Sequence, residues 1–168
     1  MTDTLVQNIV NAFSGSMPKE LIVFIISMIP VLELRGSILA AGFLKMNFLS
    51  TYIIAVIGNM IPIPFILLFI DKIFDFLRKT RFKPMVEKFE KRALSKSDQI
   101  KKYGKFGLFL FVAIPLPGTG AWTGSLIAAL LGIKFKKAFP AVIIGILMAT
   151  VIMWFVSYVL LGGVHLLG

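Results

Sequence analysis

Long stretches without a charged residue dominate the pattern of hydrophobic and polar positions. They cover residues 46–70, 106–133 and 138–168, and they measure 25, 28 and 31 residues. About 20 apolar residues are enough to span the hydrocarbon core of a bilayer. A chain of 168 residues, 58% of them hydrophobic, could not bury that much apolar surface in one soluble core. The pattern therefore predicts an all-α integral membrane protein.

A fourth apolar stretch, residues 21–44, carries two charges close to its middle. They are Glu33 and Arg35, within P-V-L-E-L-R-G at 30–36. If every apolar stretch were one crossing, this pair would lie inside a helix at the bilayer centre. Four crossings would also separate the basic loop at 72–105 from the lysines at 134–137. That separation goes against the tendency of basic loops to remain in the cytoplasm.

Two re-entrant hairpins explain these features together. Residues 21–29 and 37–44 would form arms that reach only about 12–14 Å, roughly half of the hydrocarbon thickness. Pro30 and Gly36 would interrupt the helix between them. Residues 106–133 repeat the layout around P-L-P-G-T-G-A-W-T-G at 115–124. The breakers in that second turn are Pro115, Pro117, Gly118, Gly120 and Gly124. We predict hairpins at 21–44 and 106–133, and membrane-crossing helices at 46–70 and 136–161.

This topology gathers fifteen of the eighteen basic residues on one side, at 72–105 and 134–137. We expect that side to be the cytoplasmic face of an inner membrane, with both termini outside. The net charge of +10 then belongs to membrane flanks, and no nucleic-acid partner is expected. Residues 1–20 predict an interfacial amphipathic helix, with its apolar side at Leu5, Ile9, Val10 and Phe13. Residues 71–105 predict an amphipathic helix on anionic lipid, or else a solvated linker helix.

The two hairpin–helix segments are similar in sequence. S-I-L-A-A-G at 37–42 is similar to S-L-I-A-A-L-L-G at 125–132, and Gly58 and Gly145 occupy similar depths in the following helices. Since the hairpins would enter from opposite faces, we predict an inverted repeat within one membrane domain, 1–168. Broken helices that meet near the midplane are typical of secondary transporters.

The first crossing helix carries Asn59, Pro62 and Pro64, and the prolines predict a kink near its middle. A buried amide at that depth needs hydrogen-bond partners. The hairpin turns could supply them, or Asn59 could simply join two helices.

Glu33 and Arg35 are the charges available for chemistry inside the hairpins. An extended turn after Pro30 would let the two side chains pair, and three roles remain open. They could form a structural ion pair, or they could make a protein–protein contact. Alternatively, Arg35 could bind a phosphate or carboxylate while Glu33 takes up a proton.

The second turn is uncharged. Gly118 and Gly120 allow close backbone approach, Thr119 and Thr123 add hydroxyls, and Trp122 offers a flat wall. Backbone N–H groups at the start of the next arm favour an anion, although tight packing without any ligand explains the same residues.

Other chemistry is not indicated. The chain has no cysteine and no G-x-x-x-x-G-K-[ST] loop, and no catalytic set or metal cluster stands out. The only histidine, His165, is expected at the membrane interface. We expect no enzyme activity, no metal and no cofactor.

Three motifs carry a family resemblance: E-L-R-G at 33–36, G-N-M-I-P-I-P at 58–64 and P-L-P-G-T-G-A-W-T-G at 115–124. Together they resemble the putative small multidrug export protein family, over nearly the whole chain from about residue 20. That family is similar to the wider DedA (VTT-domain) superfamily. The resemblance implies paired opposed hairpins and lipid movement, including polyprenyl phosphate recycling, driven by the proton-motive force. It also implies acidic and arginine residues in the membrane, for which Glu33 and Arg35 are the candidates.

These observations predict a proton-linked secondary transporter that moves an amphiphilic anion, such as a polyprenyl phosphate, between Arg35 and the Gly118–Gly124 turn. The alternatives are a small-molecule multidrug exporter and a membrane scaffold or assembly factor that transports nothing. We expect membrane lipids as partners and a homodimer.

Overall fold

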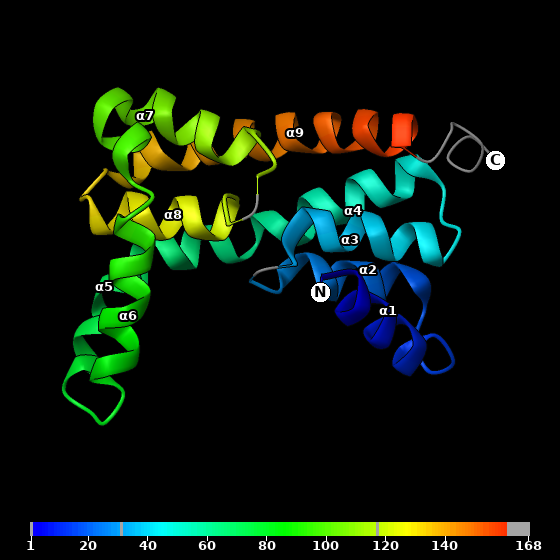
Figure 1. Cartoon of the computed structure of the whole chain (residues 1–168), viewed down its shortest axis with the longest axis horizontal. Coiled ribbons are helices and arrows are strands. Elements are labelled where there is room, and N and C mark those ends of the chain that lie inside the picture. Colours follow the sequence, from blue (N-terminus) through cyan, green and yellow to red (C-terminus); the bar gives the residue numbers. More distant parts are fainter. Residues whose placement is uncertain (1, 31, 117, 161–168) are drawn as a thin grey trace. The chain divides into compact units, whose positions relative to one another are not determined.

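The computed structural model describes residues 2–30, 32–116 and 118–160 (Figure 1). Within these ranges the chain is helical and contains no strand. The helices are α1 (Thr2–Phe13), α2 (Lys19–Met28), α3 (Glu33–Phe43), α4 (Phe48–Met60), α5 (Pro62–Arg78), α6 (Lys83–Leu94), α7 (Asp98–Ala113), α8 (Ala121–Leu130) and α9 (Phe135–Leu160).

Two helical segments are long and apolar enough to cross a membrane, Phe48–Arg78 and Phe135–Met153. Each leaves large apolar side chains exposed at helical spacing. On α4 the exposed row is Leu49, Ile53 and Ile57, whereas Thr51, Ala55 and Asn59 are buried on the other side. Lipid rather than water suits such a row, because exposed apolar surface costs about 25 cal/mol per Å² in water. The prediction of an all-α membrane protein is consistent with this arrangement.

The helix over 48–78 is interrupted at Ile61, as the prolines predict. Helix α4 ends at Met60 and α5 begins at Pro62. Pro62 and Pro64 have no N–H, but both lie in the first turn of α5, where backbone N–H groups lack helical partners anyway. The prolines therefore end one helix and start the next.

The chain divides at this interruption into two compact units. The first unit joins Met1–Ile61 to the chain from Ile146 onward, and the second is Pro62–Gly145. Each unit is described by itself.

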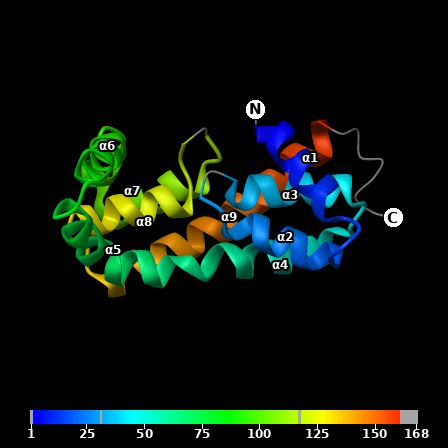
Figure 2. The same ribbon diagram turned by 90° about the horizontal axis from the view of Figure 1, so that it is seen from below.

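In the first unit, α2 and α3 form a helical hairpin that packs against α1 and α4 (Figure 2). Residues 21–44 are therefore not one rod, as predicted. Its core includes Ile22, Val23, Ile26, Ala40 and Ala41, with Val6 and Val10 of α1. The predicted apolar residues of the N-terminal helix divide between this core and the surface, and its place at the membrane interface stays a prediction. Val10 is buried in this core, but Leu5 is 51% and Phe13 42% exposed.

The second arm of this hairpin begins earlier than predicted. Helix α3 starts at Glu33, because Leu32 already has helical dihedrals and accepts a hydrogen bond of 2.8 Å from the Gly36 N–H. Gly36 is therefore not a helix breaker. A Cβ at Gly36 would lie 2.7 Å from Leu32 Cβ and 3.2 Å from Ile26 Cγ2, so this glycine permits close packing of the arms.

In the second unit the chain reverses inside α7. Gly104 has φ 56° and ψ −128°, which only glycine adopts readily. The backbone of Gln99 and Ile100 lies against Gly107, with Ile100 Cα 3.1 Å from where a Gly107 Cβ would be. Residues eight apart in one straight helix would be about 12 Å apart along its axis. The chain therefore turns back at Gly104, and the segment before it contacts Gly107.

After this reversal, α7 and α8 form the second helical hairpin. Gly124 of α8 packs on α7, where a Cβ would lie 2.7 Å from Val112 Cγ2 and 3.4 Å from Leu108 Cδ1. Gly124 therefore lies inside a helix and is not the predicted breaker. Helix α8 begins at Ala121, four residues before the predicted arm. Pro115 lies in the turn between the helices, and Pro117 lies outside the described residues.

The helices that follow the two hairpins have similar local contacts. A Cβ at Gly58 would meet Ser27 Oγ and lie 3.0 Å from the carbonyl oxygen of Phe24. A Cβ at Gly145 would lie 2.7 Å from Val112 Cβ and 3.2 Å from the carbonyl oxygen of Phe109. In both cases the crossing helix touches the first arm of its own hairpin at a glycine.

The C-terminal ends of α3 and α8 are also alike. The Met46 N–H donates to the Ala41 oxygen at 3.0 Å, and the Ile133 N–H donates to the Ala128 oxygen at 2.9 Å. The residue before each donor has positive φ, 50° at Lys45 and 66° at Gly132. These are the features of a Schellman motif.

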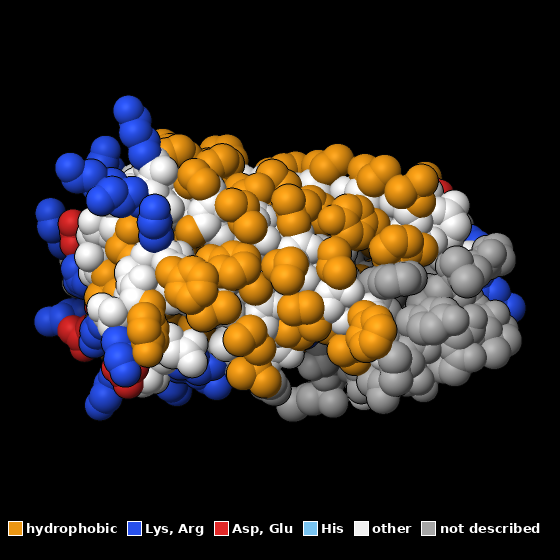
Figure 3. All heavy atoms as spheres, turned by 90° about the horizontal axis from the view of Figure 1, so that it is seen from above, with side chains coloured by type: hydrophobic (Ala, Val, Ile, Leu, Met, Phe, Trp, Pro, Cys, Tyr) orange, Lys and Arg blue, Asp and Glu red, His pale blue; other side chains and the backbone are white. Residues whose placement is uncertain are grey.

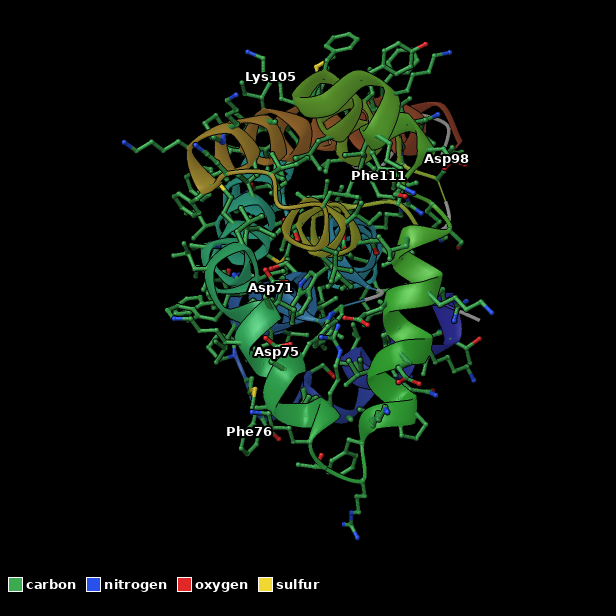
Figure 4. The ribbon with its side chains drawn as sticks, turned by 90° about the vertical axis from the view of Figure 1, so that its left-hand side faces the viewer. Asp71, Asp75, Phe76, Asp98, Lys105 and Phe111 are labelled. Carbon is green, nitrogen blue, oxygen red and sulfur yellow. The ribbon has the colours of Figure 1, made fainter. Side chains whose placement is uncertain are left out.

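On the face that Figure 3 shows, many lysine and arginine side chains of the second unit gather at one end of it. The segment 71–105 contains the end of α5, all of α6 and the start of α7. Arg78 forms ion pairs with Asp75, at 2.8 Å, and with Glu90 of α6. Phe76 points away from α6 (Figure 4) and is 68% exposed.

Candidate functional site

The first candidate site is the start of α3, where Glu33 and Arg35 stand in the first helical turn. Both side chains are half-buried, and their charges interact. We predicted an extended turn at these positions, and the helix shows that this was wrong. The pair therefore lies in the first turn of α3, where Arg35 is helical and Glu33 has positive φ.

The backbone of Glu33 is unusual. Its φ is 45°, in the left-handed region that a residue with a side chain rarely adopts. Its N–H donates to the Ile29 oxygen at 3.0 Å, which holds the turn closed. Such strained positions cluster at functional sites, so Glu33 is a candidate on conformation as well as on charge.

The second candidate site is the turn between α7 and α8. Gly118 has φ 79°, as a tight turn requires. The Thr119 hydroxyl lies 2.8 Å from the Ile114 and Leu116 oxygens and accepts from the Leu116 N–H at 3.1 Å. The Thr119 hydroxyl thus helps to close the turn, and its contact with substrate stays a prediction.

Sequence reasoning missed one charged residue at this second turn. Lys96 Nζ donates to the Gly118 carbonyl oxygen at 2.9 Å. We had placed Lys96 in the basic cytoplasmic segment and described the turn as uncharged. No rule about residue spacing could have placed Lys96 at this turn, because its position depends on the reversal at Gly104. The signal available was a single glycine inside an otherwise helical pattern.

Residues 33–152 match the family described as "Putative small multi-drug export protein". The chain belongs to this family. The matched range begins at Glu33 and includes both candidate sites, the interruption at Ile61 and most of α9. No curated protein and no solved structure matches the chain. The relation of this family to the DedA superfamily stays a prediction.

The family description and the two apolar spans agree on a membrane transport protein. The other residues predicted for the second turn lie at the start of α8. Gly120 precedes α8, while Trp122 and Thr123 are half-buried in its first turn. They belong to the second unit with Lys96, whereas Glu33 and Arg35 belong to the first.

Asn59 lies in the first unit, in the last turn of α4, and is 2% exposed. Its side-chain oxygen accepts no hydrogen bond from the described residues. A buried amide oxygen without a donor is costly, which keeps Asn59 among the candidates for a substrate contact.

The described residues contain no group of three His, Cys, Asp or Glu that could hold a metal ion. His165 lies outside the described residues.

Proposed function

We propose that this family member is a secondary transporter whose preferred cargo is an amphiphilic anion, most simply a lipid phosphate such as a polyprenyl phosphate. In this proposal the hairpins α2–α3 and α7–α8 are re-entrant, and they enter the inner membrane from opposite faces. The basic end of the second unit then faces the cytoplasm.

The observation that carries the proposal is Arg35 at the start of α3. Its guanidinium is half-buried, and the residues of the hairpin that carries it are almost all apolar. A charge inside a membrane protein costs several kcal/mol unless it is paired or hydrated, and for that reason it usually marks a substrate or ion pathway. The planar fork of arginine fits phosphate and carboxylate oxygens.

Glu33 supplies a means of proton coupling. Its charge interacts with that of Arg35. An anion that draws the guanidinium away removes the charge that favours the carboxylate, so protonation of Glu33 becomes easier. Anion binding and proton uptake are linked in this way, as proton-driven transport requires.

The local likenesses between the two hairpin–helix segments support an inverted repeat. The glycine contacts of Gly58 and Gly145 and the hydrogen bonds that end α3 and α8 recur in the same order. Inverted repeats with short broken helices are a common transporter layout.

The test is transport in liposomes that contain the purified protein. A fluorescent polyprenyl phosphate and a cationic dye are offered separately. We expect movement of the lipid, and a decrease of about tenfold or more in Arg35→Gln, because a hydrogen bond to a charged group contributes about 1.5–3 kcal/mol. Lys19→Gln is the matched control, since Lys19 is exposed in the same unit. Transport of the dye without the lipid would overturn the proposal.

Export of small hydrophobic cations is the second candidate, and the family description favours it. It predicts that Glu33 contacts the drug and that Arg35 is dispensable. The double charge swap Glu33→Arg with Arg35→Glu separates both candidates from a scaffold. A structural pair would tolerate the exchange, whereas a carrier would lose transport.

A further inference from the structure

We propose that Lys96 is an anion-binding residue of the second hairpin, and that it takes the phosphate or carboxylate headgroup of the transported amphiphile. This inference rests on the proposed function and adds a second cation to it. The observation behind it is the contact between Lys96 Nζ and the Gly118 carbonyl oxygen, 2.9 Å long.

The reversal of α7 places Lys96 at the turn. At Gly104 the chain turns back, so that Gln99 and Ile100 lie against Gly107. Lys96, four residues before Ile100 in the chain, reaches the turn at the Gly118 oxygen. If the hairpin dips into the membrane, Lys96 is carried in with it.

The backbone around Lys96 is firmly held. Ser97 is fully buried, and its hydroxyl donates to the Leu94 oxygen at 2.6 Å. Ile100 is 1% exposed. The backbone that carries Lys96 is therefore fixed by packed neighbours, and the half-buried side chain reaches the Gly118 oxygen from it.

The charge of Lys96 has no counter-ion in the described part of the chain. Among the described residues, no carboxylate lies within ion-pair distance of its ammonium, whereas Arg78 and Lys83 in the same unit are paired. An ammonium has three N–H donors, and one of them reaches Gly118. Two donors remain for an anion, and a half-buried cation whose described contact is a neutral carbonyl favours an anionic ligand.

The first experiment is lysine acetylation of the wild-type protein in liposomes, read by mass spectrometry. Lys96 is compared with Lys101, which is exposed in the same segment. We expect long-chain polyprenyl phosphate, but not the uncharged polyprenol, to slow acetylation of Lys96 at least about threefold. Lys101 should not change. Equal protection by both lipids, or protection of neither lysine, would overturn the inference.

The second experiment is transport by Lys96→Gln, Lys96→Arg and the control Lys101→Gln. The glutamine amide can still donate to the Gly118 oxygen, so a residue that only holds the turn would be replaced with little loss. We expect Lys96→Gln to raise the lipid concentration at half-maximal rate about tenfold, with an unchanged melting temperature, and Lys96→Arg to restore most of the affinity. Wild-type kinetics in Lys96→Gln, or equal loss of stability and transport, would overturn the inference.

The two proposals fail in different ways. If wild-type protein binds the lipid phosphate at Lys96 but does not move it, the transporter proposal fails and the binding residue stands. If wild-type protein moves the lipid and Lys96→Gln matches it, only the inference about Lys96 fails.

Discussion

Gly58 of α4 faces the hydroxyl of Ser27 on α2 so closely that no Cβ atom would fit between them. The carbonyl oxygen of Phe24 would lie 3.0 Å from the same position. The first hairpin and the helix that follows it are therefore in contact at a point where only glycine fits.

We expect Gly58→Ala to lower the free energy of unfolding by about 1–3 kcal/mol, because overpacking forces the two helices apart. Thermal unfolding in detergent micelles measures the change. Gly42→Ala is the control, since nothing lies within 4 Å of Gly42. The control should stabilise the helix by up to about 1 kcal/mol, and equal destabilisation by both variants would contradict the packing argument.

The serines that begin the similar sequence stretches should respond differently to alanine. Ser37 is fully buried and donates to the Leu34 oxygen at 2.8 Å. Ser125 is fully buried too, but its hydroxyl has no hydrogen-bond partner among the described residues. Ser37→Ala should lower stability by about 0.5–1.5 kcal/mol. Ser125→Ala should leave the melting temperature unchanged or raise it, and a marked decrease would show that this hydroxyl has a partner in the membrane.

The C-terminal end of α3 offers a stabilising change. Lys45 has φ 50°, a conformation that suits glycine, and Gly132 occupies the matching position after α8. Lys45→Gly should raise stability by about 1 kcal/mol, and Gly132→Ala should lower it by a similar amount. Both changes are measurable by chemical or thermal unfolding. A stabilising Gly132→Ala would contradict the assigned backbone.

The proposed topology is testable by labelling, because the chain has no native cysteine. Single variants Lys45→Cys, Lys105→Cys and Lys134→Cys place a thiol at three exposed positions. We expect a membrane-impermeant maleimide to label the last two from the cytoplasmic side and Lys45→Cys from the other side. Labelling of positions 45 and 134 from one side would exclude the two opposed hairpins.

Proline chemistry made much of the fold predictable. The turn after α2 contains Pro30, the interruption at Ile61 precedes Pro62 and Pro64, and Pro115 follows α7. A proline lacks the donor that a helix interior needs, whatever surrounds it. These positions could therefore be read without knowledge of tertiary contacts.

Glycine was less informative. Gly36 and Gly124 were predicted to break helices, yet both lie inside helices, where they let neighbouring side chains approach. Whether a glycine ends a helix or packs in one depends on what lies opposite, and that information is tertiary. The same error placed the predicted second arms too late, at 37 and 125, whereas α3 begins at Glu33 and α8 at Ala121.

The candidate site was predicted in part. Glu33 and Arg35 stood out because charges are rare in an apolar stretch, but their strained, helical setting could not be foreseen. Lys96 could not be distinguished from its basic neighbours, since residues 88–105 contain many lysines. Its assignment needs the three-dimensional path of the chain.

That path depends on one residue without a side chain. Gly104 has open space around it, with nothing within 4 Å of where a Cβ would be, but its φ of 56° and ψ of −128° exclude most other residues. A bulky substitution there would meet no steric obstacle and would still favour a straight α7. Straightening would withdraw an ammonium group from the hairpin turn without altering any charged residue. The electrostatics of this protein can therefore be changed by a mutation that itself carries no charge.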